Sequence, residues 1–183
     1  QYFERLVSCS RCTPVLIEAD KYEFYQKWYH TAVLEMLHII RFDGDYAALG
    51  KLLIPKVSTA EAKSAIALLE KLGLIAQKED GSYTPTDALI STGYDAHALA
   101  VYTFQQEMLR LAREGYFRFK PEQRSYSTLT LSISEDDYRT ILEELRAFRK
   151  RVLEIAAQTP SAGKVFQFNF QVFPLSENLQ REN

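Results

Sequence analysis

The chain has 183 residues, of which 46% are hydrophobic and 25% are charged, a composition typical of a folded globular protein. Its formal net charge is -2, so it lacks the overall basic excess that drives nonspecific binding to nucleic acids. No apolar run approaches the roughly 20 residues of a membrane span, and two cysteines are too few for a disulfide framework, so we expect a cytoplasmic protein without a membrane partner.

Residues 1–20 are expected to be the tail of a preceding domain or a linker, because residues 1–7 look like the second half of a helix. This segment carries Cys9 and Cys12 in a Cys-x-x-Cys pair. A zinc site needs about four ligands, and a thioredoxin-like redox pair needs a β-α-β context. We therefore predict a structural or incidental pair. A metal shared between two copies, or a thiol whose pKa nearby Arg11 lowers, are the alternatives.

Residues 21–95 are predicted to form a domain that begins with two helices. Apolar and aromatic residues recur at helical spacing from Tyr22 to Ile40, which predicts an amphipathic helix with an aromatic start. The sequence Asp43-Gly44-Asp45 ends this helix, and a second, short helix is expected from Tyr46 to Leu53.

A longer helix and a hairpin complete this domain. Ser58 and Glu61 have the spacing of a capping box, and Gly73 suits the left-handed position that ends the helix. Two strand-like stretches then flank Asp80-Gly81, a pair favoured in tight hairpin turns. Helix, short helix, longer helix and hairpin is the order of a winged helix-turn-helix, which is our prediction for this domain.

Residues 96–183 are predicted to form a second unit, which starts with a long helix over His97–Phe119. Strictly alternating polarity predicts strands over Tyr126–Ile133 and Lys164–Phe173, with a helix over Ser134–Gln158 between them. Two strands are too few for a stable sheet, so neighbouring helices or a partner chain must cover Phe166, Phe168 and Phe170. The expected fold is α+β: a winged helix-turn-helix, a helix and a small strand-helix-strand unit.

Four stretches of the chain resemble, in the same order, a bacterial family known as a domain of unknown function. They are Tyr25-Gln26-Lys27-Trp28-Tyr29-His30, Leu72-Gly73-Leu74-Ile75, the run from Glu122 to Leu131, and the run from Phe168 to Leu175. The likeness extends from about Tyr2 to Leu175, and the pair Cys9 and Cys12 departs from it. In that family the domain typically follows a helix-turn-helix of the lambda-repressor type. The resemblance therefore implies a module for assembly, sensing or secondary DNA contact in a transcription regulator.

The helix that would enter the major groove supplies most of the candidate DNA contacts. These are Thr59, Lys63, Ser64 and Lys71, with Lys78 on the expected wing. Between Arg41 and Thr86 the cationic and anionic residues cancel, and the helix carries no arginine to contact guanine. Direct binding to double-stranded DNA and protein contact are equally open interpretations of this helix.

Two arginines are candidate anion-binding residues, Arg124 and Arg149. Arg149 lies in a basic stretch near the end of the helix expected over Ser134–Gln158, where basic side chains complement the helix dipole and pair with nearby glutamates. We expect that structural role, with phosphate contact as the alternative. His30 is expected to be a packed or surface-edge histidine and not a base or ligand, although the aromatic residues Tyr25, Trp28 and Tyr29 near it could line a small apolar pocket.

No combination of residues indicates catalysis, a metal site or a cofactor. We expect a regulatory domain of a DNA-binding transcription regulator, assembled as a homodimer and responding to an effector that the sequence does not identify. An interaction scaffold or a small-molecule sensor, neither of them binding DNA, are the alternatives.

Overall fold

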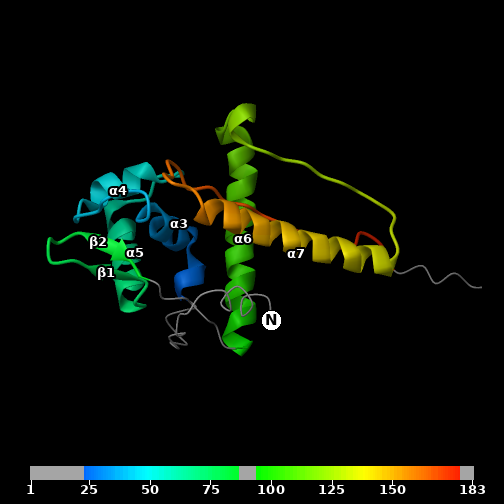
Figure 1. Cartoon of the computed structure of the whole chain (residues 1–183), viewed down its shortest axis with the longest axis horizontal. Coiled ribbons are helices and arrows are strands. Elements are labelled where there is room, and N and C mark those ends of the chain that lie inside the picture. The colour runs from blue at the N-terminus through cyan, green and yellow to red at the C-terminus, as the bar shows by residue number, and fades with distance from the viewer. Residues whose placement is uncertain (1–22, 87–93, 178–183) are drawn as a thin grey trace, which may run out of the picture.

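The computed structural model describes residues 23–86 and 94–177, with the side chains of residues 94–99 left out. Figure 1 shows one small group of helices and strands beside a long upright helix, which a second long helix crosses. The elements in chain order are α3 (Trp28–Met36), α4 (Tyr46–Leu52), α5 (Thr59–Lys71), β1 (Ile75–Gln77), β2 (Tyr83–Pro85), α6 (Tyr94–Arg118), the 3-10 turn η1 (Pro121–Gln123) and α7 (Glu135–Ala157). The described residues are thus mainly helical with one small antiparallel sheet, and the expected α+β class holds at this level.

The core lies between α3, α4, α5 and the sheet, where α5 packs against both α3 and α4. Its most completely buried large side chains are Val33, Leu49, Ile66 and Leu69. These residues come from three different helices, so burying their apolar surface holds the three helices together. Partly buried side chains of α6 pack against the same core.

The predicted helix over Tyr22–Ile40 is too long. Residues 23–26 form a separate helical turn, Lys27 is extended with φ −128° and ψ 127°, and α3 starts at Trp28. Across this break, Nδ1 of His30 lies 3.1 Å from the backbone oxygen of Phe24. Because the break turns the chain, Phe24 and Trp28 both reach the core.

The predicted capped start and glycine end of α5 are confirmed, and so is a hairpin around Gly81. Ser58 Oγ accepts a hydrogen bond from the Glu61 backbone N–H at 3.2 Å, and Glu61 Oε2 accepts one from the Ser58 backbone N–H at 2.8 Å. Gly73, just after the helix, has φ +68°, which a side chain would disfavour. In the hairpin, Ala76 pairs with Thr84, and Gly81 has φ +80° in the turn.

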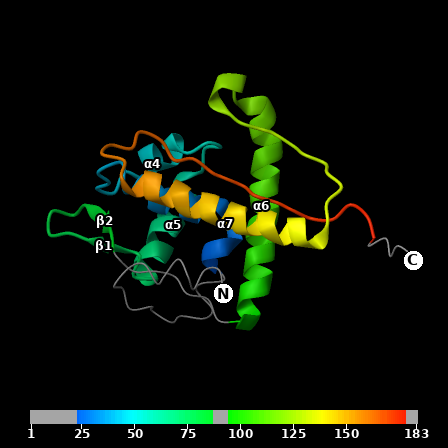
Figure 2. The ribbon, with the colours of Figure 1, turned by 45° about the vertical axis from the view of Figure 1, so that its right-hand side comes forward.

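Two long helices dominate the second half of the chain. Helix α7 is capped by Ser134, whose side chain accepts a hydrogen bond from the Asp137 backbone N–H, in agreement with the predicted capped start. In Figures 1 and 2, α7 crosses the middle of α6, and its C-terminal end points toward the group formed by α3, α4 and α5. Neither of them, nor any other helix in the described ranges, is long and apolar enough to cross a membrane.

The prediction of two strands beside α7 is wrong for the single chain. Residues 124–134 and 162–174 are neither helix nor strand, and within residues 125–133 and 162–174 no backbone group pairs with the backbone of another segment among the described residues. Both run in the same general direction in the two views but do not form a sheet with each other (Figure 2). The alternation of polarity was read correctly, but a strand also needs a neighbour to accept and donate its hydrogen bonds.

Candidate functional site

Four of the predicted DNA-contacting residues lie on the outer side of α5. Thr59, Lys63, Ser64 and Lys71 are exposed, while the core side of the helix carries Ala62, Ala65, Ile66 and Leu69. Lys63 and Lys71 are eight residues apart, which places them about 80° apart around the helix axis, on the same broad exposed side. The structure therefore brings these four residues to one surface, and Lys78 lies exposed beyond β1.

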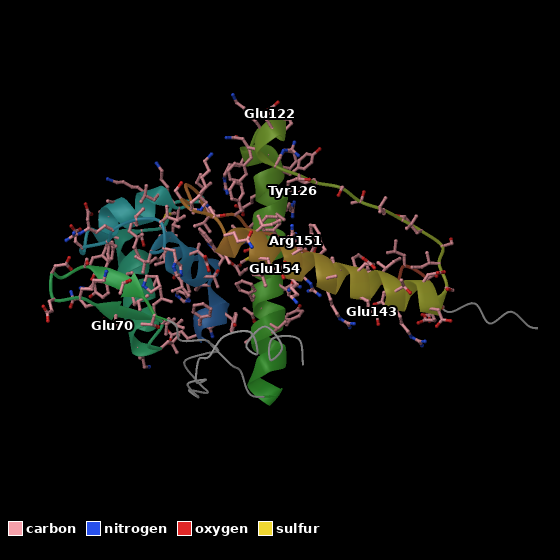
Figure 3. All side chains as sticks on the ribbon, in the orientation of Figure 1. Glu70, Glu122, Tyr126, Glu143, Arg151 and Glu154 are labelled. Atoms are coloured by element: carbon pink, nitrogen blue, oxygen red, sulfur yellow. The ribbon has the colours of Figure 1, made fainter. Side chains whose placement is uncertain are left out.

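Acidic side chains on and near α5 offset the positive charge of its exposed lysines. Glu70 is exposed on the same helix, as Figure 3 shows, and Glu61 is held by the capping box. At the hairpin, Arg41 forms an exposed ion pair with Asp80 at 3.0 Å. Hydrogen bonds from Ser82 to the Asp80 carboxylate are the main reason that the pKa of Asp80 lies below its ordinary value. The arginine nearest the hairpin is thus already paired with an anion.

The aromatic residues before and within α3 belong to the core. Trp28 and Tyr29 are buried, and the ring of Tyr25 packs edge-on against Phe104 of α6 at 5.6 Å. Of the packed and surface-edge positions predicted for His30, the structure shows the packed one, and burial lowers the pKa of this side chain. These rings pack against one another and against α6. The structure therefore gives them a role in the core and does not support the prediction of a ligand pocket at this place.

The two candidate anion-binding arginines differ in their surroundings. Arg124 donates a hydrogen bond from Nε to the backbone oxygen of Phe119 at 3.1 Å, and its guanidinium lies 4.0 Å from the ring centre of Tyr116. Both contacts fix the chain where it leaves α6, which gives Arg124 a structural role. Arg149 is half-buried on α7. Its neighbour Arg151 is exposed and lies 3.5 Å from Glu154, as the predicted pairing with glutamates requires.

The exposed apolar surface extends well beyond the residues Phe166, Phe168 and Phe170 for which the sequence predicted a cover. Helix α7 has no buried residue, although its sequence is strongly amphipathic. The segment before it exposes Leu129 by 86% and Leu131 by 63%, where we expected a half-buried strand face. The segment after it exposes Phe166 and Phe168 by 67% and 55%. Unusually large exposed apolar surfaces mark places where another surface binds.

A few defined contacts hold the C-terminal half in place. Tyr126 donates a hydrogen bond from its hydroxyl group to the backbone oxygen of Ala112 on α6 at 2.6 Å (Figure 3). Asn169 donates one from Nδ2 to the backbone oxygen of Met108, also on α6, at 3.2 Å. Both extended segments are therefore anchored to α6 by side chains, while their backbone groups stay free of backbone partners within the described chain. These contacts leave α7 without a buried residue and Leu129 and Phe166 of the two segments largely exposed.

Some predictions fall outside the described residues. The pair Cys9 and Cys12, and the tail over residues 1–20 as a whole, belong to this group. Across the described ranges, no three His, Cys, Asp or Glu side chains come together as metal ligands could.

Comparison with models of protein families gives a match. The model of a family described as "Domain of unknown function (DUF4423)" matches residues 15–175, which include every described helix and both strands. A search of curated proteins finds no match.

Proposed function

This chain belongs to the DUF4423 family, and we propose that it assembles a transcription regulator into homodimers through its C-terminal half. One observation carries the proposal: α7, 23 residues long, buries none of them within its own chain. An amphipathic helix owes most of its stability in a protein to packing its apolar side. A second chain supplies the surface that is missing here.

The extended segments on either side of α7 support the same proposal. Residues 126–133 and 164–173 have the alternating pattern of strands but have no backbone partner within the described chain. Exposed strand edges readily pair with strands of another molecule. The predicted strands therefore form when two copies meet, and the apolar faces that carry Leu129 and Phe166 become covered at the same time.

The regulator part of the proposal rests on the N-terminal unit. Helices α3, α4 and α5 followed by the β1-β2 hairpin have the order of a winged helix-turn-helix, with α5 in the position of the recognition helix. The sequence resemblance adds a lambda-repressor-type DNA-binding domain in the same regulator. In this arrangement the dimer would hold two such DNA-binding domains together, as two-fold operators require.

A second candidate function is an additional DNA contact through α5. It is favoured by the exposure of Thr59, Lys63 and Ser64 on one side of that helix, where the core makes no use of them. It is the weaker candidate, because acidic residues balance the basic ones between Arg41 and Thr86, whereas phosphate-binding surfaces have a basic excess.

Sedimentation velocity over a concentration series tests the proposed function. The expected species has twice the 21.1 kDa mass of one chain and dissociates on dilution. A chain that sediments as a monomer at every concentration contradicts assembly through this half. In that case the exposed side of α5 becomes the better candidate site.

A further inference from the structure

The charges of α7 are divided between its two halves. Residues 135–144 carry five carboxylates and one arginine, whereas residues 145–157 carry four basic side chains and one glutamate. Figure 3 shows Glu143 in the first half of the helix and Arg151 toward its other end. The first half is acidic and the second is basic, so the helix has a strong charge polarity along its axis.

An apolar row runs along the same helix. Ile141, Phe148 and Ile155 follow one another at intervals of seven residues and are 38%, 52% and 57% exposed. Seven residues are close to two helical turns, so these side chains lie on one side of α7. Tyr138, Leu145 and Val152 alternate with them at spacings of three and four and are half-buried. Together the six residues form the two-position seam through which paired helices pack.

We propose that the second copy lays its own α7 antiparallel on this seam, with the two-fold axis close to Phe148. The inference rests on the proposed function, because it specifies how the two copies meet. In this geometry Ile141 of one copy lies opposite Ile155 of the second copy. Each acidic half lies beside a basic half, whereas parallel helices would place the acidic halves side by side.

One pair of oppositely charged residues can be used to test the register of the two α7 helices. Glu144 precedes Phe148 by four residues and Arg151 follows it by three, so antiparallel pairing brings Glu144 of each copy to Arg151 of the other. Within the described chain, Glu144 makes no ion pair, and Arg151 has an exposed contact with Glu154 that contributes little. Both side chains are exposed and accessible to a second copy.

The first test introduces a charge into the seam. We expect Phe148→Glu to raise the dimer dissociation constant at least tenfold in sedimentation equilibrium, because it places two carboxylates at the axis. Ala147→Glu is the matched control: the neighbouring side chain is exposed, lies off the seam and gains the same charge. Circular dichroism of both variants checks that the helices are retained, which we expect because α7 buries no residue in the single chain.

The second test exchanges the two charges. Glu144→Arg and Arg151→Glu should each raise the dimer dissociation constant, by about two- to fivefold for every ion pair affected. The double variant should restore the wild-type dissociation constant. Glu143→Arg, on the outer side of the helix, controls for the change in net charge and should leave the affinity unchanged.

The outcomes separate this geometry from the proposed function. A wild-type dimer that is insensitive to Phe148→Glu, or whose Glu144 and Arg151 variants fail to rescue each other, overturns the antiparallel contact but leaves homodimerisation standing. A monomeric wild-type chain overturns both. Loss of the dimer in Phe148→Glu together with rescue in the double variant supports the contact as described.

Discussion

The ring of Phe148 packs edge-on against the ring of Phe170, with the ring centres 6.0 Å apart and the planes at 82°. This contact joins α7 to the extended segment that follows it. It occupies one side of Phe148, which remains 52% exposed. In the proposed dimer the other side of the same ring meets the second copy, so Phe148 links the C-terminal segment to the contact between chains.

Hydrogen–deuterium exchange should show the extended segments protected in the dimer. The amides of residues 127–133 and 165–173 have no backbone acceptor in the described chain, so in a monomer they exchange freely. Pairing with the second copy would slow their exchange. We expect strong protection at high protein concentration and its loss in Phe148→Glu, measured by mass spectrometry of peptic peptides. Rapid exchange of these amides in a protein shown to be dimeric would contradict strand formation between copies.

DNA contact through α5 should have a measurable salt signature. In fluorescence anisotropy with duplex DNA, we expect Lys63→Ala to reduce the slope of log affinity against log salt by about one, because one phosphate contact is lost. Lys150→Ala, on α7, is the control and should leave the slope unchanged. If the wild-type chain shows no salt-dependent binding, the second candidate function is wrong.

Stability should decrease in mildly acidic solution because of His30. Burial lowers the pKa of this side chain in the folded state, so the unfolded chain binds the proton more readily. The contribution of neutral, buried His30 to the free energy of unfolding is complete above the ordinary histidine pKa of about 6.5. It is lost as the pH falls from that value through the lowered pKa of the folded state. Thermal unfolding between pH 7.5 and 5 should be less pH-dependent in His30→Gln than in the wild type. The exposed His38 offers the control: His38→Gln should keep the wild-type dependence.

The capping box of α5 should contribute measurably to folding. Ser58→Ala removes the oxygen that accepts from the Glu61 backbone N–H, and we expect a loss of about 1 kcal/mol in the free energy of unfolding. Ser64→Ala changes an exposed serine within the same helix and should alter this free energy little. Denaturant titration of the two variants gives the comparison, and equal effects would argue against the cap.

Gly50 should tolerate no side chain. A Cβ atom at this position would lie 2.5 Å from the backbone oxygen of Val57, because the loop after α4 returns closely to the helix. We expect Gly50→Ala to lower the free energy of unfolding by about 1–3 kcal/mol, as overpacking does. At Gly163 an added Cβ meets no atom within 4 Å, so Gly163→Ala is the matched control. Similar stability of the two variants would show that the loop can move away at little cost.

Local signals in the sequence were sufficient for most of the helices. The capping residues Ser58 and Ser134, the glycine at 73 and the turn around Gly81 were all identified correctly, because each acts through atoms only a few residues away. The break at Lys27 was missed. Helical spacing continues through that position in the sequence, and only the packing of Phe24 and Trp28 in the same core explains the turn of the chain.

The sequence by itself therefore determined most of the helices, the caps at Ser58 and Ser134, the hairpin and the alternating character of residues 126–133 and 164–173, since these depend on local hydrogen bonds and periodicity. Whether those alternating residues find a neighbour depends on contacts between distant segments, which a linear pattern does not contain. Only the tertiary structure decided that question: it anchors both extended segments to α6 and leaves α7 without a buried residue. The seam and the divided charges of α7 were present in the sequence, but they point to an interface only because the fold leaves them exposed.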